Sequence, residues 1–521
     1  MSKPRRTSKD VEPLSPRERG RGEGSATAQT PRATEPSSGA ARHLLPEGEG
    51  KAPRSSFPRK RESSDFARLS DRESFQTLNG LWKGKSGPLT RAAVIRNTNF
   101  TNDGHLDLSN VAVLDVETRQ LATRTLQRHD IIIERSGGGP KQPVGRVCIF
   151  DAEGELPFSF SNFTSVIRVV DRGKWLPRHV HYYLLHLYKD GYTEGLQHAT
   201  TGIRNLDFSS YLDTAVPFVP KPEQQKIAAV LWKLQRAIAT QDKLLKATAD
   251  LKASAMQRLF THGLRGEPLK DTEIGPMPES WQLLPLGQVV KLERGRFMHR
   301  PRNEPRFYGG NTPFVQTGDV VRSNGRIRHY SQSLNDDGVA ISKVFPRGTI
   351  LITIAANIGF TGILEFDSAC PDSLIGITCM EHMDAEFLNF YLQTQQADMD
   401  RLAPKGTQKN INIQFLQPWP TKVPALDEQR AIASALATLD RKLAHHRAKR
   451  TALDDLFQTL LHQLMTGAIR VDTLHIDMSE VANHFPDVGK MVGKPAATID
   501  DQFVGANKLI RTRNPSKHKE A

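Results

Sequence analysis

The sequence predicts an α+β protein: two mixed α/β domains separated by two long helices that form an antiparallel coiled coil. The first observation behind this is an internal repeat, because residues 223–265 recur as residues 428–470 at a constant offset of 205. Both copies open with Glu-Gln-x-x-Ile-Ala, and at least twelve identities stay in register between them. The second observation is that the segment between the two copies repeats the organisation of the segment before the first.

The repeated segments have the pattern of a coiled-coil seam. In the second copy, apolar residues alternate by four and three positions from Ile432 to Leu464. Both seams turn polar near their centres, for example at Gln241, Lys252 and His446, and polar seam positions can fix register and partner. Each helix would be about 60 Å long at a rise of about 1.5 Å per residue. An ordinary helical bundle is the alternative, but it does not explain the duplication of the intervening segment.

Composition limits the class of partner. The chain has 521 residues, a formal net charge of +14 and a pI near 9.6, which favour a polyanion such as double-stranded DNA. A membrane partner fits less well, because no apolar run approaches the roughly 18 residues of a spanning helix. The three cysteines have neither metal-site nor disulfide spacing, so a cytoplasmic location is expected.

The first third of the chain divides into an extension and a globular domain. Residues 1–75 are rich in Arg, Ser, Pro, Gly and Glu without periodicity, which predicts a disordered basic extension. Residues 76–221 form the first predicted domain, and residues 222–265 the first long helix. Strands are predicted in this domain at residues 92–95, 131–133, 147–150 and 165–170, and a helix at residues 179–189.

The remaining boundaries follow the repeat. Residues 266–281 are expected to be a linker, residues 282–421 the second domain, residues 422–470 the second long helix, and residues 471–521 a polar tail. Asn205 and Asn410 again differ by 205 positions, and each precedes a short run that leads into a repeated helix.

Loops with Arg, Lys, Asn and Gln side chains are the candidate DNA contacts. Arg reads guanine and Asn or Gln reads adenine through paired hydrogen bonds in the major groove, whereas contacts to phosphates set register and affinity. A glycine run, as in Glu134-Arg135-Ser136-Gly137-Gly138, can also bring backbone N–H groups close to phosphate. For each residue alone, a solvated loop position is the alternative, so the loops are stronger candidates as groups. The candidates are Arg96, Asn97, Arg135, Ser136 and Lys141 in the first domain and Gln316, Thr317, Arg322, Asn357, Gln408, Lys409 and Asn410 in the second.

On these motifs the chain resembles the DNA-specificity (S) subunits of type I restriction–modification enzymes, over about residues 78–470. The pair of Glu-Gln-x-x-Ile-Ala helices carries most of the resemblance, with support from residues 274–281 and from the turn at residues 134–138. The resemblance implies two target-recognition domains, each reading one half of an interrupted DNA site. It also implies docking of two methyltransferase (M) subunits and of endonuclease/translocase (R) subunits. No Pro-x-x-Trp counterpart of Pro278–Trp281 precedes Leu81, so the first domain is expected to lack its usual opening or to begin differently.

The resemblance further implies a chain without a catalytic site, cofactor or metal of its own. S-adenosylmethionine, ATP and Mg²⁺ are expected in the partner subunits. One alternative is a self-contained restriction or methylation enzyme with fused recognition domains. The absence of an Asn-Pro-Pro-aromatic motif and of a glycine motif for S-adenosylmethionine argues against it. Another alternative is a coiled-coil scaffold that binds DNA without reading its sequence, and equal binding to every sequence would favour it.

Overall fold

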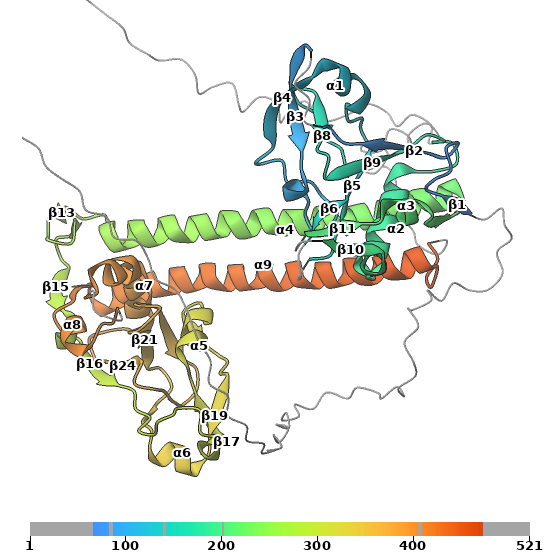
Figure 1. Cartoon of the computed structure of the whole chain (residues 1–521). Helices are drawn as coiled ribbons and strands as arrows, with labels where there is room; N and C mark the ends of the chain where they lie inside the picture. Colours follow the sequence, from blue (N-terminus) through green and yellow to red (C-terminus); the bar gives the residue numbers. More distant parts are fainter. Residues whose placement is uncertain (1–65, 83–86, 139–141, 201–202, 405–408, 472–521) are drawn as a thin grey trace, which may run out of the picture. The chain divides into compact units, whose positions relative to one another are not determined.

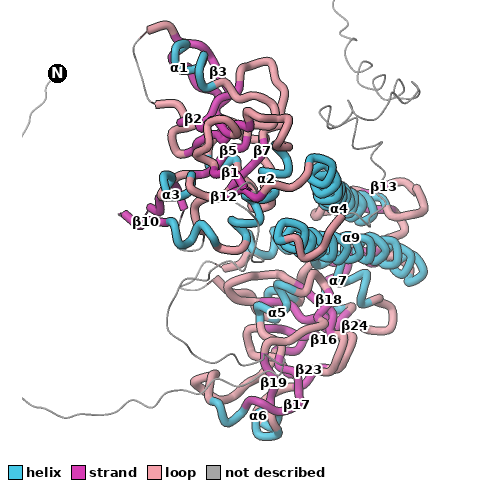
Figure 2. The backbone as a smooth tube through the Cα atoms, turned by 90° about the vertical axis from the view of Figure 1, so that its right-hand side faces the viewer, coloured by secondary structure: helices cyan, strands magenta, loops and turns pink. Residues whose placement is uncertain are grey.

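Two β-rich domains and two long helices make up the computed structural model, which describes residues 66–82, 87–138, 142–200, 203–404 and 409–471. The long helices are α4 (Lys221–His262) and α9 (Leu426–Thr466). They lie side by side in both views (Figures 1 and 2). The predicted α+β class and the predicted helix pair are confirmed. Within the described ranges, no helix has the length and hydrophobicity to cross a membrane.

The first domain is built on a four-stranded antiparallel sheet. Its strand order is β2–β9–β5–β7, with β2 (Phe75–Asn79), β9 (Thr164–Val169), β5 (Ile131–Glu134) and β7 (Val147–Ile149). All four residues of β5 are buried, which is why its first three residues are consecutive isoleucines rather than alternating apolar and polar residues. The predicted strands at residues 92–95, 131–133, 147–150 and 165–170 and the predicted helix at residues 179–189 are confirmed.

Smaller sheets and short helices complete this domain. One sheet has the order β4–β3–β8, with β4 (Ala112–Glu117), β3 (Leu89–Ile95) and β8 (Phe158–Phe160), and another joins β10 (Gln197–Thr200), β11 (Ile203–Leu206) and β6 (Ser136–Gly138). The helices are α1 (Thr118–Arg124), α2 (Pro177–Lys189) and α3 (Phe208–Leu212), with a 3₁₀ turn η1 at Asn97–Asn99.

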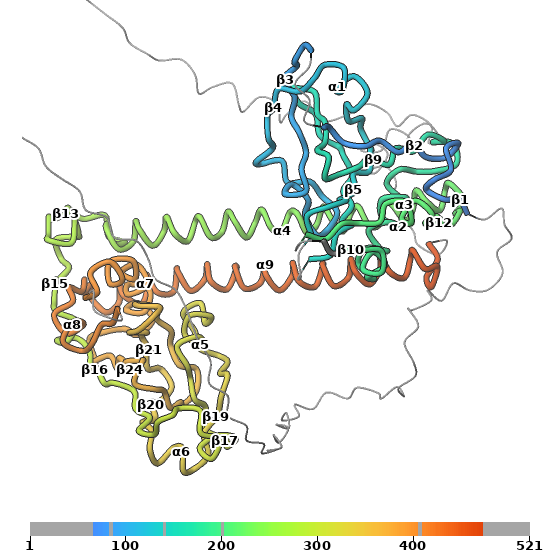
Figure 3. The backbone as a smooth tube through the Cα atoms, viewed as in Figure 1, coloured from blue at the N-terminus to red at the C-terminus, as the bar shows by residue number. Residues whose placement is uncertain are grey.

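The second domain follows α4 through the short strands β13 (Leu269–Lys270) and β14 (Met277–Pro278), a path that Figure 3 traces. Its main sheet has the order β16–β24–β21–β22–β18, with β16 (Val290–Arg294), β24 (Leu374–Cys379), β21 (Ile350–Thr353), β22 (Thr361–Leu364) and β18 (Arg326–Ile327). Its second sheet has the order β19–β17–β23–β20, with β19 (Gln332–Leu334), β17 (Tyr308–Phe314), β23 (Ser368–Ala369) and β20 (Val344–Phe345). The helices are α5 (Thr317–Arg322), α6 (Asp336–Ala340), α7 (Ala385–Leu402) and α8 (Ile413–Leu416).

The two domains repeat one topology. The antiparallel order β2–β9–β5–β7 corresponds to β16–β24–β21–β22. In the second sheets, β3 and β17 each pair with one antiparallel and one parallel neighbour. The duplication that the sequence shows in the two long helices therefore extends to the two folded domains.

The first domain also has an opening strand, which corrects the predicted extent of the disordered extension and agrees with a domain that begins differently. Strand β1 (Phe66–Arg68) pairs with β12 (Ala215–Pro217), as β15 (Gln282–Pro285) pairs with β25 (Pro420–Val423). Residues 66–75 therefore belong to the first domain rather than to a disordered extension. The opening was missed because β1 is only three residues long and follows a polar segment. Residues 1–65 and 472–521, which hold the rest of the predicted extension and tail, lie outside the described residues.

The repeated glutamine of each Glu-Gln-x-x-Ile-Ala motif joins a long helix to its domain. The Gln224 side chain accepts a hydrogen bond from the Leu176 N–H at the start of α2 and donates to the carbonyls of Lys174 and Val219. The Gln429 side chain accepts from the Asp384 N–H at the start of α7 and donates to His382 and Pro424. Both glutamines are fully buried. The motif is therefore an anchor for the first turn of a domain helix.

Polar contacts at equivalent positions close the helix pair. Near one end Arg265 lies 3.5 Å from Glu428, and near the other the equivalent Arg470 lies 3.5 Å from Glu223. At the centre, the ring Nδ1 of His446 lies 2.9 Å from Oε1 of Gln241. These two central residues are themselves repeat equivalents, so a pseudo-twofold axis passes close to them.

Each domain core includes one end of both helices. The first core contains Ile227 and Leu231 of α4 together with Phe457 and Leu461 of α9. The second contains Phe260 of α4 together with Ile432 and Leu436 of α9, and these belong to the opposite ends of the helices. Burial of such side chains contributes about 1.5–3 kcal/mol each, so the helices and domains stabilise one another.

Candidate nucleic-acid interface

Two loops occupy equivalent places after the central strands β5 and β21. In the first domain, Ser136 pairs with Asn205, the residue from the segment before α4. In the second, Ala355 pairs with Asn410, the residue from the segment before α9. The 205-residue offset between the two asparagines therefore reflects one structural position used twice. These two loops are the candidate interface.

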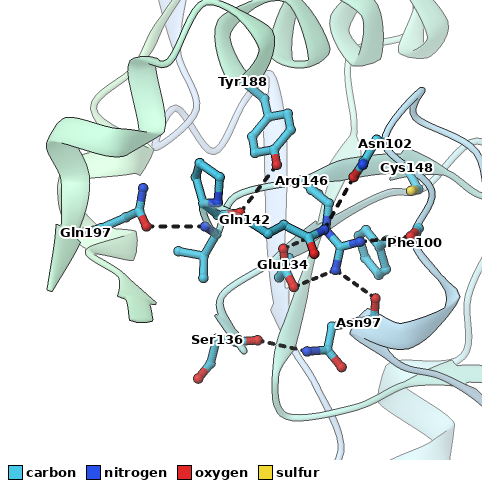
Figure 4. Close-up of polar contacts among 12 residues, drawn as sticks. Asn97, Phe100, Asn102, Glu134, Ser136, Gln142, Arg146, Cys148, Tyr188 and Gln197 are labelled. Atoms are coloured by element: carbon cyan, nitrogen blue, oxygen red, sulfur yellow. Dashed lines mark hydrogen bonds and ion pairs between the residues drawn. The ribbon is translucent and has the colours of Figure 1, made fainter. Parts of the chain in front are cut away.

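The loop of the first domain rests on a buried ion pair between Arg146 and Glu134 (Figure 4). The guanidinium donates two hydrogen bonds to the Glu134 carboxylate, at 2.9 and 2.8 Å, and others to the carbonyls of Phe100 and Asn97. Burial alone would lower the pKa of Arg146, but the hydrogen bonds and the charge of Glu134 overcome it and raise the pKa. The loop is therefore tied to the turn that carries Asn97.

Arg96 and Asn97 begin the 3₁₀ turn η1, and both are half-buried. The Asn97 side chain donates to the Ser136 carbonyl at 3.2 Å, so it links the turn to the loop. Gly137 adopts a φ of 114°, and a Cβ there would lie 2.1 Å from Nδ2 of Asn97. Glycine is required at this position because only it allows both the backbone angle and the close approach.

Arg135 and Ser136 also make internal contacts. The Arg135 guanidinium donates to Oδ1 of Asn79 at 3.0 Å and lies 4.6 Å from the centre of the Phe208 ring. Burial lowers the pKa of Arg135. The Ser136 hydroxyl donates to the side chain of Asn205. These side chains shape the loop, while Lys141 lies outside the described residues.

The start of α5 in the second domain is the counterpart of η1. Gln316 is the N-cap of α5, as Arg96 is the N-cap of η1, and each backbone N–H bonds to a side chain three residues later. The Thr317 hydroxyl lies 3.2 Å from the hydroxyl of Ser373. Arg322 contacts Asp319 at 2.8 Å but its side chain is 71% exposed.

The loop after β21 is more open than its counterpart. Asn357 and Asn410 are both exposed. Lys409 is half-buried and forms an ion pair with Asp400 at 2.9 Å. Among the described residues, the Asn357 and Asn410 side chains have no hydrogen bond partner, so their amide groups remain available to a ligand. Gln408 lies outside the described residues.

Sequence reasoning missed an exposed basic and aromatic segment beside α5. Arg328, His329 and Tyr330 follow strand β18 and are all exposed, with Tyr330 at 46%. The signal was present, because three arginines occur between positions 322 and 328 with a tyrosine after them. An aromatic side chain among cations is a common feature of nucleic-acid surfaces.

A family model and several known proteins match the chain. The family model, described as type I restriction modification DNA specificity domain, matches residues 61–247 and 278–454, which together make up more than half of the chain.

A putative type I restriction enzyme MjaX specificity subunit from Methanocaldococcus jannaschii is 24% identical over 398 residues, covering 75% of this chain and 89% of that protein. The MjaVIII specificity subunit from the same organism is 25% identical and covers 53% of this chain and 67% of that protein. A crystal structure of a type I restriction-modification system S subunit from M. genitalium has a similar fold, with a TM-score of 0.50 and 16% identity. It covers 78% of this chain and 97% of that one.

Proposed function

Because this chain belongs to the family of type I restriction–modification DNA specificity subunits, which are not themselves catalytic, we propose that its two domains read the two halves of an interrupted duplex site. The observation that carries the proposal is the equivalence of the loops after β5 and β21, each joined to the segment before a long helix. One recognition surface built twice on a rigid pair of helices suits two separate half-sites on one duplex.

The residues at each loop have different roles in this proposal. Asn357 and Asn410 carry exposed amides and are the proposed readers of base edges in the second half-site. Arg322 at the end of α5, together with Arg328 and Tyr330 after β18, is exposed, and these three residues are proposed to contact the DNA backbone.

In the first domain Arg96, Asn97, Arg135 and Ser136 face the DNA as parts of a fixed loop. Their internal hydrogen bonds support a role in shaping the surface, with the backbone of the glycine turn approaching phosphate.

The helix pair is proposed to set the distance between half-sites. Two domains that bind one face of a duplex would read half-sites about one helical turn apart, roughly ten base pairs from centre to centre. Each domain is anchored to the helices through a buried glutamine, which supports a fixed spacing.

The same helices are proposed to dock two methyltransferase subunits. The pair Asp250-Leu251 in α4 recurs as Asp455-Leu456 in α9, and all four residues are exposed, Leu251 at 56% and Leu456 at 44%. Because about half of each leucine side chain faces solvent, packing between the two helices does not account for it. Its occurrence at both equivalent positions is accounted for if two copies of one partner each meet the same surface.

Methylation and cleavage would then occur in the partners. A methyltransferase subunit would take up S-adenosylmethionine and flip the target adenine out of the stack, at a cost of a few kcal/mol. An endonuclease/translocase subunit would supply the chemistry that needs ATP and Mg²⁺. This chain would position the DNA for both.

A map of N6-methyladenine in the native host, with and without the gene, tests the proposal. We expect an interrupted motif that disappears on deletion and returns with the wild-type gene. When the deleted gene is replaced by the double variant Asn357→Ala/Asn410→Ala, the methylated motif should become less specific in one half-site only. Each lost base contact is worth about 1–3 kcal/mol of discrimination between bases. Asn311→Ala, at an exposed position of β17, is the matched control and should restore the original motif. A motif that is unchanged by deletion of the gene would reject the proposal.

A further inference from the structure

Three side chains with metal-ligand chemistry meet where the first domain contacts α9. His186 lies in the last turn of α2, Asp190 follows that helix as its C-cap, and His462 lies near the end of α9. One ligand atom from each of the three lies within 4.8 Å of the other two. None of them is among the candidate DNA contacts, so the proposed function leaves this cluster unexplained.

We propose that His186, Asp190 and His462 form a binding site for a zinc-class divalent cation that fastens α2 of the first domain to α9. The site goes beyond the proposed function, because it would stabilise the contact between the first domain and α9 whether or not the chain reads DNA.

The spacing of each histidine from the Asp190 carboxylate fits a tetrahedral metal centre, and the three ligand atoms lie within 4.8 Å of one another. Nδ1 of His186 lies 3.6 Å from Oδ1 of Asp190, and Nδ1 of His462 lies 3.3 Å from Oδ2 of the same carboxylate. Zinc bonds of about 2.0–2.2 Å to nitrogen and oxygen place neighbouring ligand atoms about 3.3–3.6 Å apart in a tetrahedron. Two imidazoles and one carboxylate are a ligand set that zinc-class cations favour, and the Irving–Williams order ranks their affinities.

The cluster is buried on one side and open to solvent on the other, as a site that a cation can enter must be. The His186 side chain is only 7% exposed, whereas Asp190 is 45% and His462 is 57% exposed. The buried ligand is therefore fixed by the domain core, and the other two face solvent. The two exposed ligands let a cation reach the cluster from solvent, and water would supply the fourth ligand of a bound zinc-class cation.

The electrostatic position of Asp190 also favours a cation. The last carbonyl groups of α2 carry partial negative charge, so a carboxylate at the C-cap is unfavourable there. Among the described residues, the ion-pair partners of Asp190 are the two histidines and include no Lys or Arg. A divalent cation would neutralise the carboxylate and the helix end together.

The second domain lacks this ligand set at the equivalent place. Leu176 and Asp384 donate to the repeated glutamines and so correspond to each other. Counting from them, His186 corresponds to Thr394 and Asp190 to Asp398, and His462 is equivalent to Gln257 through the repeat. The cluster is thus an addition to the first domain and not a consequence of the shared topology.

Cobalt titration of the full chain tests the site, because tetrahedral Co²⁺ has an intense visible absorption. We expect His462→Gln to remove one equivalent of this absorption and His445→Gln to keep it. His462 is exposed, so its substitution should not prevent folding, and His445 is an exposed histidine of the same helix. The difference between the variants isolates this site from any other histidine of the chain.

Thermal unfolding gives a second readout that needs no partner subunits and no DNA. Zn²⁺ at about one hundred times its dissociation constant should raise the unfolding temperature of the first domain by about 5–10 °C. A chelator should reverse the shift, and His462→Gln should abolish it while His445→Gln retains it. Absence of the cobalt absorption, or equal absorption in His462→Gln and wild type, would refute the site. Loss of methylation without loss of cobalt binding would instead count against the proposed function alone.

Discussion

The pair Arg146–Glu134 shows how one buried contact can define a recognition loop. Glu134 is 1% and the Arg146 side chain 11% exposed, and the guanidinium bridges the carboxylate to the turn at Asn97. A buried ion pair adds little net stability over apolar residues, but removal of one partner leaves an uncompensated charge. The contact therefore selects one loop conformation more than it stabilises the domain.

Arg146→Met should destabilise the first domain by about 3–5 kcal/mol, because Glu134 would remain buried without a partner. Urea unfolding followed by tryptophan fluorescence measures this change. Arg401→Met is the control, since Arg401 pairs with Asp398 at the surface and its loss should cost about 0–1 kcal/mol. Equal effects from the two substitutions would contradict the assignment.

Buried histidines in α2 predict that acid weakens the first domain. Burial lowers the pKa of His181 to about 3, with Arg178 and His105 adding to the effect, and burial lowers the pKa of His179 to about 4. The unfolded chain takes up these protons near pH 6.5, whereas the folded domain resists them. Stability is therefore complete above about pH 6.5 and falls as the pH drops toward 4, by up to about 1.4 kcal/mol per pH unit for each group.

Unfolding of the first domain by urea between pH 7 and pH 4.5 measures this slope. His181→Gln should reduce it, because glutamine has no proton to take up, and the exposed control His445→Gln should leave it unchanged. A slope that is the same in all three proteins would show that other groups control the acid response.

Residue roles were the least predictable part of the candidate site. The sequence located the loops, since Ser136, Asn205, Ala355 and Asn410 do meet in equivalent pairs. It could not tell that the Arg135 side chain is engaged by Asn79 and by the Phe208 ring, because polarity does not reveal the partners of a side chain. Which of the candidates contact DNA stays a prediction.

At the scale of elements, the buried glutamines explain why the Glu-Gln-x-x-Ile-Ala motif occurs twice. Each glutamine satisfies one N–H and two carbonyl groups at the junction of a domain and a helix. The N–H groups of Leu176 and Asp384 are at the starts of α2 and α7, where intrahelical partners are missing, and the carbonyls precede a domain helix or a long helix. The motif was visible in the sequence, but its hydrogen bonds join residues about fifty positions apart and were not.

Gln224→Ala and Gln429→Ala should each destabilise one domain and spare the other. Each leaves buried polar groups without partners, at a cost of about 1–3 kcal/mol per group. Hydrogen exchange should rise at the start of α2 in the first variant and at the start of α7 in the second. If either substitution affected both helices equally, the domains would not be anchored independently.

The exposed leucines of the helix pair predict separate partner contacts. Leu251→Asp and Leu456→Asp should each halve the number of methyltransferase subunits bound per chain, and the double variant should bind none. Mass photometry of the purified complex measures the stoichiometry. Leu244→Asp is the matched control, because Leu244 is also exposed, at 39%, but corresponds to Lys449 in the second copy. Full binding by the double variant would exclude these surfaces as docking sites.

Long elements were predictable and short ones were not. The repeat and its heptad seam predict the two helices, and the run of isoleucines predicts the buried strand β5. Strand β1 has three residues and an alternating burial pattern too short to recognise. Its position depends on pairing with β12, about 150 residues away, which local sequence does not encode.

For the whole molecule, the helix pair connects the two domain cores and is expected to act as a ruler. Removing one heptad from each helix, symmetrically about Gln241 and His446, would shorten the pair by about 10 Å at about 1.5 Å per residue. The gap between half-sites should then shrink by about three base pairs, at about 3.4 Å each. Methylation mapping of a host that carries the shortened gene reads the new gap, and an unchanged gap would exclude the ruler.

The contact between Gln241 and His446 also bears on how a duplicated chain keeps its halves distinct. A residue away from the pseudo-twofold axis contacts a residue at a different position of the repeat. A residue on the axis contacts its own repeat equivalent, as Gln241 contacts His446. If two first halves paired with each other, Gln241 would face Gln241, and two second halves would place His446 against His446. A change at this one position is therefore enough to make intramolecular pairing chemically different from self-association of either half.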